Sequence, residues 1–229
     1  MTHAGRVRER NEDSILTDPS GALWAVADGM GGYGNGDVAS DMVIEALSTV
    51  PDDALAGPAL QGRLEEANRR IRAHSLKQLT GNIGATVVAM LIQNSVAHLA
   101  WAGDCRGYLM RGRQLRLMTH DHTVVQDLVD QGLLTEERSE RHPEAHVVTR
   151  AVGFEDRIEI ELAAVPLVPG DRVLLCSDGL TTCIGDQEIA DSMARAADPD
   201  ALCRGLIAAT LEAGAPDNVS VIAVFAGAG

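Results

Sequence analysis

Four aspartates of this sequence share one local setting, in which the acid stands directly beside a glycine or an asparagine. They are Asp28 before Gly29, Asp104 after Gly103, Asp178 before Gly179 and Asp217 before Asn218. Hard divalent cations such as Mg²⁺ and Mn²⁺ bind carboxylate oxygens, carbonyl oxygens and water. An aspartate beside a glycine more often only closes a turn. A single pair therefore does not indicate a metal site, and the interpretation depends on whether the four acids come together.

Hydrophobic runs place three of these aspartates at the ends of predicted strands. Residues 22–27 are typical of a buried strand that runs into Asp28 and a glycine-rich turn, and residues 172–176 form a second strand that ends before Asp178. Asp217 directly precedes a third predicted strand at 219–225. Strand ends that meet at one edge would bring the carboxylates together, as a site for hard cations requires.

The other predicted elements form one domain of mixed helices and strands, spanning residues 1–229. Apolar spacing predicts helices at 37–50, 58–79, 186–196 and 199–213, and consecutive strands at 84–92, 96–102 and 106–111. Consecutive short strands indicate antiparallel pairing. Residues 119–150 are charged and rich in histidine, with one short amphipathic piece at 124–134, and we expect them to form a mobile, flap-like segment.

The composition argues against several kinds of partner. Nineteen basic and thirty-three acidic residues give a formal net charge of −14, which is unfavourable for binding a nucleic-acid backbone or an anionic membrane. No apolar run approaches the roughly 20 residues that span a bilayer, and the first residues lack the apolar core of a signal peptide. We therefore expect a cytoplasmic protein that does not bind nucleic acid or membrane.

The cysteines and histidines do not indicate a zinc site. The four cysteines are scattered without a C-x-x-C pair, which favours reduced, buried thiols over a disulfide framework. Two histidine pairs, His120 with His122 and His142 with His146, lack a matching set of Cys or His elsewhere.

Six short motifs follow one another along the chain. They are Arg8-x-x-Asn11-Glu12-Asp13, Asp28-Gly29-Met30-Gly31-Gly32, Gly84-Ala85-Thr86, Gly103-Asp104-Cys105-Arg106, Ser177-Asp178-Gly179-Leu180 and Asp217-Asn218. Together they resemble the metal-dependent protein serine/threonine phosphatases of the 2C type, in their compact bacterial form, from residue 8 to residue 224. The resemblance implies an α+β fold, a four-layer α-β-β-α sandwich of two antiparallel sheets flanked by helices, with the metal site at one end.

The resemblance also implies ligands for two tightly bound Mn²⁺ or Mg²⁺ ions. Asp28 would bridge both ions, the Gly29 carbonyl would bind one of them, and Asp178 and Asp217 would hold the other. Two cations of this kind lower the pKa of a water molecule and offset the charge of the phosphoryl oxygens for in-line attack. No phosphoenzyme is needed.

Three further acids are implied around these ligands. Glu12 and Asp13 would support the site through metal-bound water or through hydrogen bonds to the ligands. Asp104 lies in a motif that helps bind a third, weaker cation in bacterial relatives, with Asp178 as a shared ligand.

The substrate phosphate is expected to contact Arg8 and Asn218. The resemblance makes Arg8 the phosphate-binding arginine, and a planar guanidinium can grip two phosphate oxygens at once. Met30 stands where the best-known animal members have a histidine. Methionine cannot donate a proton, so metal-bound water is the expected donor to the leaving oxygen. Cys105 and Ser220 are milder departures, since serine and threonine are usual there.

The implied function is the hydrolysis of phosphoserine and phosphothreonine in proteins, which reverses signalling by serine/threonine kinases. The expected partners are phosphorylated proteins, including such a kinase or its substrates, and the protein is expected to be a monomer. Two alternatives stay open. The chain could be a catalytically weak relative that acts as a phosphoprotein-binding or partner-switching module, or an enzyme dedicated to one phosphorylated regulator.

Overall fold

The computed structural model describes residues 1–18, 21–31, 35–51, 54–78, 82–139 and 142–227, and their strands form two five-stranded antiparallel sheets. Sheet A has the strand order β2 (Asp13–Thr17), β3 (Leu23–Gly31), β4 (Ile83–Gln93), β5 (Val96–Ala102) and β8 (Glu161–Pro166). Sheet B has the order β1 (Thr2–His3), β10 (Val219–Phe225), β9 (Arg172–Cys176), β6 (Arg106–Arg111) and β7 (Gln114–Leu117).

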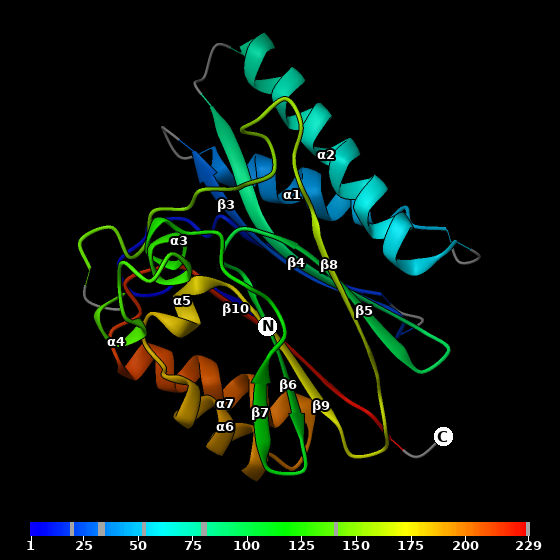
Figure 1. The fold of residues 1–229 in the computed structure, drawn as a ribbon, viewed down its shortest axis with the longest axis vertical. Coiled ribbons are helices and arrows are strands. Elements are labelled where there is room, and N and C mark those ends of the chain that lie inside the picture. The colour runs from blue at the N-terminus through cyan, green and yellow to red at the C-terminus, as the bar shows by residue number, and fades with distance from the viewer. Residues whose placement is uncertain (19–20, 32–34, 52–53, 79–81, 140–141, 228–229) are drawn as a thin grey trace.

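Helices cover the outer face of each sheet (Figure 1). Helices α1 (Gly36–Leu47) and α2 (Ala56–Gln78) pack on sheet A, and α6 (Asp186–Arg195) and α7 (Pro199–Glu212) pack on sheet B. Between β9 and α6 lies the single turn of α5 (Asp178–Thr181), while α3 (Val124–Asp130) and α4 (Glu136–Ser139) lie in the 119–150 segment. The predicted four-layer α-β-β-α sandwich is confirmed.

The central strands are apolar on both faces because each face packs against another layer. In β3, Ala25 and Ala27 pack against α1 and α2, whereas Val26 between them points into the space between the sheets. In β9, Leu174 joins the cluster formed with α6 and α7, and its neighbour Leu175 points between the sheets. Successive side chains of a strand alternate between its faces, so three apolar layers result.

One sequence prediction about the acids is wrong in detail. Asp28 was expected at a strand end, but β3 continues to Gly31 and pairs Asp28 with Thr86 of β4. The glycine-rich stretch stays extended because Gly84 and Ala85 continue the ladder opposite it. Asp178 follows the end of β9, as expected, and is the first residue of α5. Across the part of the chain that is described, no helix has the length and apolar character needed to cross a membrane.

Candidate active site

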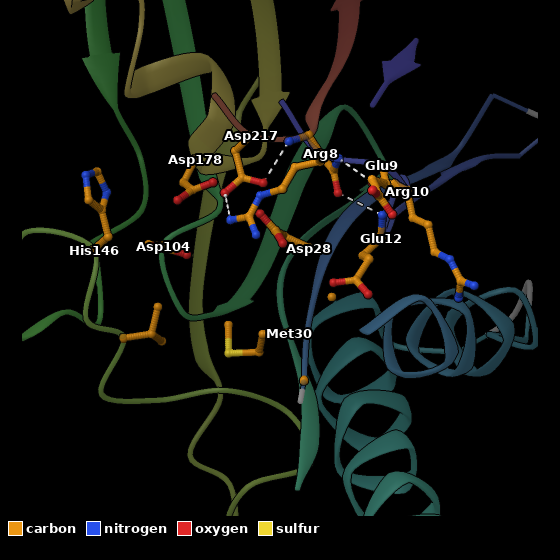
Figure 2. Close-up of a pocket in the computed structure, with 14 residues that line it drawn as sticks. Arg8, Glu9, Arg10, Glu12, Asp28, Met30, Asp104, His146, Asp178 and Asp217 are labelled. Atoms are coloured by element: carbon orange, nitrogen blue, oxygen red, sulfur yellow. Dashed lines mark hydrogen bonds and ion pairs between the residues drawn. The ribbon is translucent and has the colours of Figure 1, made fainter. Parts of the chain in front are cut away.

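An open cavity of about 720 Å³ brings together most of the residues that the sequence singled out. Its lining includes Arg8, Glu12, Asp28, Gly29, Asp104, Asp178, Asp217 and Asn218. These residues come from the loop after β1, from β3, from the turn after β5, from the start of α5 and from the loop before β10. Figure 2 shows the four aspartates in the middle of the view, with Arg8 reaching across to Asp217. Asp13 is not part of the lining and lies beside Asp28 in the β2–β3 ladder.

Gly29 lies where three backbone segments meet. Its N–H donates a hydrogen bond to the carbonyl of Glu12, with an N to O distance of 3.1 Å. A Cβ atom at this position would lie 2.1 Å from the carbonyl oxygen of Gly36 and 2.6 Å from that of Glu12. No side chain fits there. Glycine is therefore what lets the start of α1 and the end of the N-terminal loop pack against β3 beside Asp28.

Asp13 joins the two sheets beneath the cavity. Its Oδ2 atom accepts hydrogen bonds from the hydroxyls of Ser177 and Ser220, at 2.8 Å and 2.6 Å. Asp13 belongs to sheet A, Ser220 to strand β10 of sheet B, and Ser177 directly precedes α5. Burial raises the pKa of the Asp13 carboxyl to about 7, although both hydroxyls favour its charged form.

The pKa values of the other buried acids are raised as well. Burial, reinforced by the charge of Asp178, raises the pKa of Asp104 to about 8. Burial and the charge of Asp13 raise the pKa of Asp28 well above its usual range. The pKa of Asp178 is raised by burial and by the charge of Asp217. Ionising these carboxyls is therefore costly unless a cation compensates their charge.

The donor set fits hard divalent cations. Among the described residues, two buried carboxylate oxygens have no hydrogen-bond partner, Asp13 Oδ1 and Asp178 Oδ1. An unpartnered buried carboxylate oxygen is costly unless a cation satisfies it. Within the described ranges, no three or more His, Cys, Asp or Glu side chains converge closely enough to hold a metal ion by themselves. Mg²⁺ and Mn²⁺ do not need such a group, because they keep several waters and take only one or two carboxylates.

Arg8 lies at the rim of the cavity and is paired with Asp217. Its Nη2 atom lies 2.7 Å from Asp217 Oδ2, and the arginine side chain is 58% exposed. The loop that carries Arg8 is fixed by Asn218, whose amide group donates to the carbonyls of Ala4 and Arg10 and accepts from the N–H of Glu12. The predicted contact of Asn218 with phosphate stays a prediction, while its observed contacts hold the arginine loop in place.

Comparisons with known proteins identify the family. The family model described as Protein phosphatase 2C matches residues 3–128. The serine/threonine phosphatase stp of Listeria monocytogenes serotype 4b is 32% identical over 234 residues, which cover 97% of this chain and 93% of that protein. The chain belongs to the protein phosphatase 2C family.

Solved structures agree with this membership. The crystal structure of the Mycobacterium tuberculosis serine/threonine phosphatase PstP/Ppp is 36% identical, has a TM-score of 0.93, and the match covers 100% of this chain and 97% of that one. A structure of the PstP catalytic domain in complex with two manganese ions is also 36% identical, with a TM-score of 0.86 and coverage of 99% and 96%.

Within this 2C-family site, the turn that carries Asp104 is held by His122. The backbone N–H of Gly103 donates to His122 Nδ1 at 2.9 Å, and the backbone N–H of His122 donates to the Gly103 carbonyl at 3.0 Å. Since Nδ1 accepts a hydrogen bond, Nε2 carries the proton of the neutral ring and lies 2.9 Å from Glu161 Oε1. His122 thus connects the beginning of the 119–150 segment to the turn of Asp104.

Sequence reasoning missed several residues of the cavity. Glu9, Arg10, His146 and Val148 all contribute to its lining. His146 lies in the histidine-rich segment that the sequence marked as a surface flap, so histidine content was the only signal for it. Glu12 was predicted, and its Oε1 atom accepts a hydrogen bond from the N–H of Gly36 at the start of α1. The mobility and the flap-like character of this segment stay predictions.

Proposed function

We propose that this chain is a metal-dependent protein serine/threonine phosphatase that hydrolyses phosphoserine and phosphothreonine through attack by water. The observation that carries the proposal is the cavity lined by four aspartates, beneath which buried carboxylate oxygens lack a partner. Membership of the protein phosphatase 2C family and the relative solved with two manganese ions support the same reaction.

Four groups would hold the two Mn²⁺ or Mg²⁺ ions: the carboxylates of Asp28, Asp178 and Asp217 and the carbonyl of Gly29. When bound, such ions activate water and offset the charge of the phosphoryl oxygens. Asp13 would support the ligands rather than bind an ion directly, because it does not line the cavity and lies beside Asp28 in the β2–β3 ladder. All four ligand groups line the cavity, which supports these assignments.

Arg8 would bind the substrate phosphate. Its ion pair with Asp217 is exposed, and exposed pairs of this kind contribute only about 0–1 kcal/mol. The guanidinium can therefore turn an edge toward a phosphate at little cost and donate two parallel hydrogen bonds. The fixed loop keeps Arg8 within reach of the cavity while its side chain stays free to reorient.

The partners that follow are phosphorylated proteins, and we infer that a serine/threonine kinase or its substrates are among them. The cytoplasmic location and the monomeric state expected from the sequence stay predictions. The binding-module alternative makes a clear counter-prediction, since a module would bind phosphoproteins without turnover.

The test is hydrolysis of a phosphothreonine peptide and of p-nitrophenyl phosphate with Mn²⁺, with EDTA as the control. We expect turnover that EDTA abolishes and excess Mn²⁺ restores. Asp28→Ala should abolish it and weaken Mn²⁺ binding, measured by calorimetry, more than Asp178→Asn or Asp217→Asn does. A parent protein that binds Mn²⁺ and phosphopeptide without releasing phosphate would overturn the proposal in favour of the binding module.

A further inference from the structure

The proposed reaction needs a proton that the predicted site residues do not supply. When the bond between phosphorus and a serine or threonine oxygen breaks, the leaving oxygen is strongly basic and must be protonated. Met30 lines the cavity, but a thioether has no proton to give. Arg8 does not deprotonate in proteins, and Asp28, Asp178 and Asp217 are cation ligands in the proposed function. Metal-bound water is the donor expected from the sequence, and the cavity lining offers a side chain that can take this role instead.

Among the described residues, His146 is the one histidine of the cavity lining. Figure 2 shows it on the side of Asp178 away from Arg8, so that Asp178 lies between the imidazole and the guanidinium in this view. Its ring nitrogens make no hydrogen bond or ion pair with the described residues, so a proton on the ring is free for a ligand. Histidine is the side chain that gains and loses a proton near neutral pH.

The backbone that directly follows His146 is fixed. The N–H of Val124 donates to the carbonyl of Val147 at 2.9 Å, the N–H of Thr149 donates to the carbonyl of His122 at 2.8 Å, and Val148 forms a β-bridge with Thr123. The imidazole is therefore presented from an anchored stretch of the 119–150 segment.

The imidazole is also close enough to Asp178 to affect the pKa of that carboxyl. Burial is the main cause of the raised pKa of Asp178, and the charge of His146 acts in the opposite direction. His146 and Arg8 thus both act on the charge of Asp178.

The other histidines of this segment do not compete for the role. His122 is buried and bonded to Gly103 and Glu161. His120 is paired with Asp130 at 2.7 Å, and His142 accepts from the backbone N–H of Glu144. None of these three lines the cavity.

We propose that His146 is the general acid that protonates the leaving serine or threonine oxygen, a role that rests on the proposed phosphatase function. As the oxygen of water bonds to phosphorus, the P–O bond to the side chain breaks and its electron pair goes to the leaving oxygen. That oxygen takes the proton of the imidazolium, which leaves a free hydroxyl and a neutral imidazole. The attacking water loses a proton to solvent, and solvent returns one to the ring.

The test compares leaving groups that differ in their need for a proton. p-Nitrophenol leaves as a stable anion, whereas the hydroxyl of a phosphothreonine peptide does not. We expect His146→Ala to lower kcat/KM about hundredfold on the phosphothreonine peptide, within the range for general acids, and less than about threefold on p-nitrophenyl phosphate. His146→Gln, which keeps a hydrogen-bond donor without a transferable proton, should behave like the alanine variant.

The matched control is His142→Ala, which alters the same segment outside the cavity and should keep parental rates on both substrates. Equal losses on the two substrates, or loss together with a raised Mn²⁺ requirement, would mean that His146 binds substrate or metal and would overturn the proposal. Parental rates of His146→Ala on the peptide would also overturn it. If the parent hydrolyses neither substrate, the proposed phosphatase function itself fails, which is a separate outcome.

Discussion

Replacing Asp13 by asparagine should stabilise the protein when no cation is bound. The carboxyl of Asp13 is buried, and only Oδ2 has partners, the hydroxyls of Ser177 and Ser220. In Asp13→Asn the amide oxygen can still accept both hydroxyl hydrogen bonds, while the amide nitrogen takes the place of the unpartnered Oδ1. The neighbouring Asp178, whose charge opposes ionisation of Asp13, then faces a neutral donor instead of a like charge.

The size and the pH dependence of the effect follow from the pKa of Asp13. Burial raises that pKa to about 7 in the folded chain, against about 4 for an aspartate in an unfolded chain. Between these values the folded state holds a proton that the unfolded state has released, so stability falls as pH rises from about 4 through 7. At pH 8 the loss amounts to about 4 kcal/mol. Asp13→Asn should recover about 2 to 4 kcal/mol there, and little at pH 5.

Urea unfolding in EDTA at pH 5, 6, 7 and 8 measures this directly. The parent should lose stability across the series, and Asp13→Asn should show a flatter profile. Asp127→Asn, which changes an exposed aspartate of α3, is the matched control and should stay within about 0.5 kcal/mol of the parent. If Asp13→Asn is less stable than the parent at pH 8 without metal, the argument from buried charge is wrong.

Three further substitutions test the site. Arg8→Ala should lower kcat/KM on a phosphopeptide about ten- to hundredfold, because hydrogen bonds to a charged group are lost. Calorimetry should show that the variant keeps its Mn²⁺ affinity. Arg8→Lys should recover only part of the lost activity. Parental kinetics for Arg8→Ala would contradict the phosphate role. Asp104→Ala should keep two tightly bound Mn²⁺ ions and lose at least about tenfold in activity, or about 1.4 kcal/mol; full activity would remove a third cation from the mechanism. Gly29→Ala should lower the free energy of unfolding by about 3 kcal/mol, because its Cβ meets only backbone atoms, and an unchanged urea midpoint would refute this.

The sequence pattern predicted the central strands well and the edge strands poorly. Strands at 96–102, 106–111, 172–176 and 219–225 appear with the expected bounds. These are hydrophobic runs that pack on both faces, so their signal is strong. The edge strands β1, β2, β7 and β8 were missed. β8 is half-exposed along its length and β7 is mostly exposed, and short strands of this kind carry little hydrophobic pattern.

The candidate site could be predicted only in part. The aspartates were found by their glycine and asparagine neighbours, and the family resemblance supplied their roles. The contact of Asp13 with Ser177 and Ser220 joins residues more than 160 positions apart, and no local pattern encodes such a contact. The place of His146 in the cavity depends in the same way on how the 119–150 segment folds back, which the spacing of apolar residues does not determine.

The order in which the chain visits the two sheets has a consequence for how the protein unfolds. The chain begins in sheet B with β1, crosses to sheet A for β2 to β5, returns for β6 and β7, crosses again for β8 and ends in sheet B. Neither sheet can therefore form from one continuous stretch of chain. Unfolding one sheet also displaces the segments that connect it to the strands of the other. We expect one cooperative transition. A cation that binds only the folded state stabilises the whole cooperative unit. The melting temperature of the protein should therefore rise with the fraction of cavities occupied by cations.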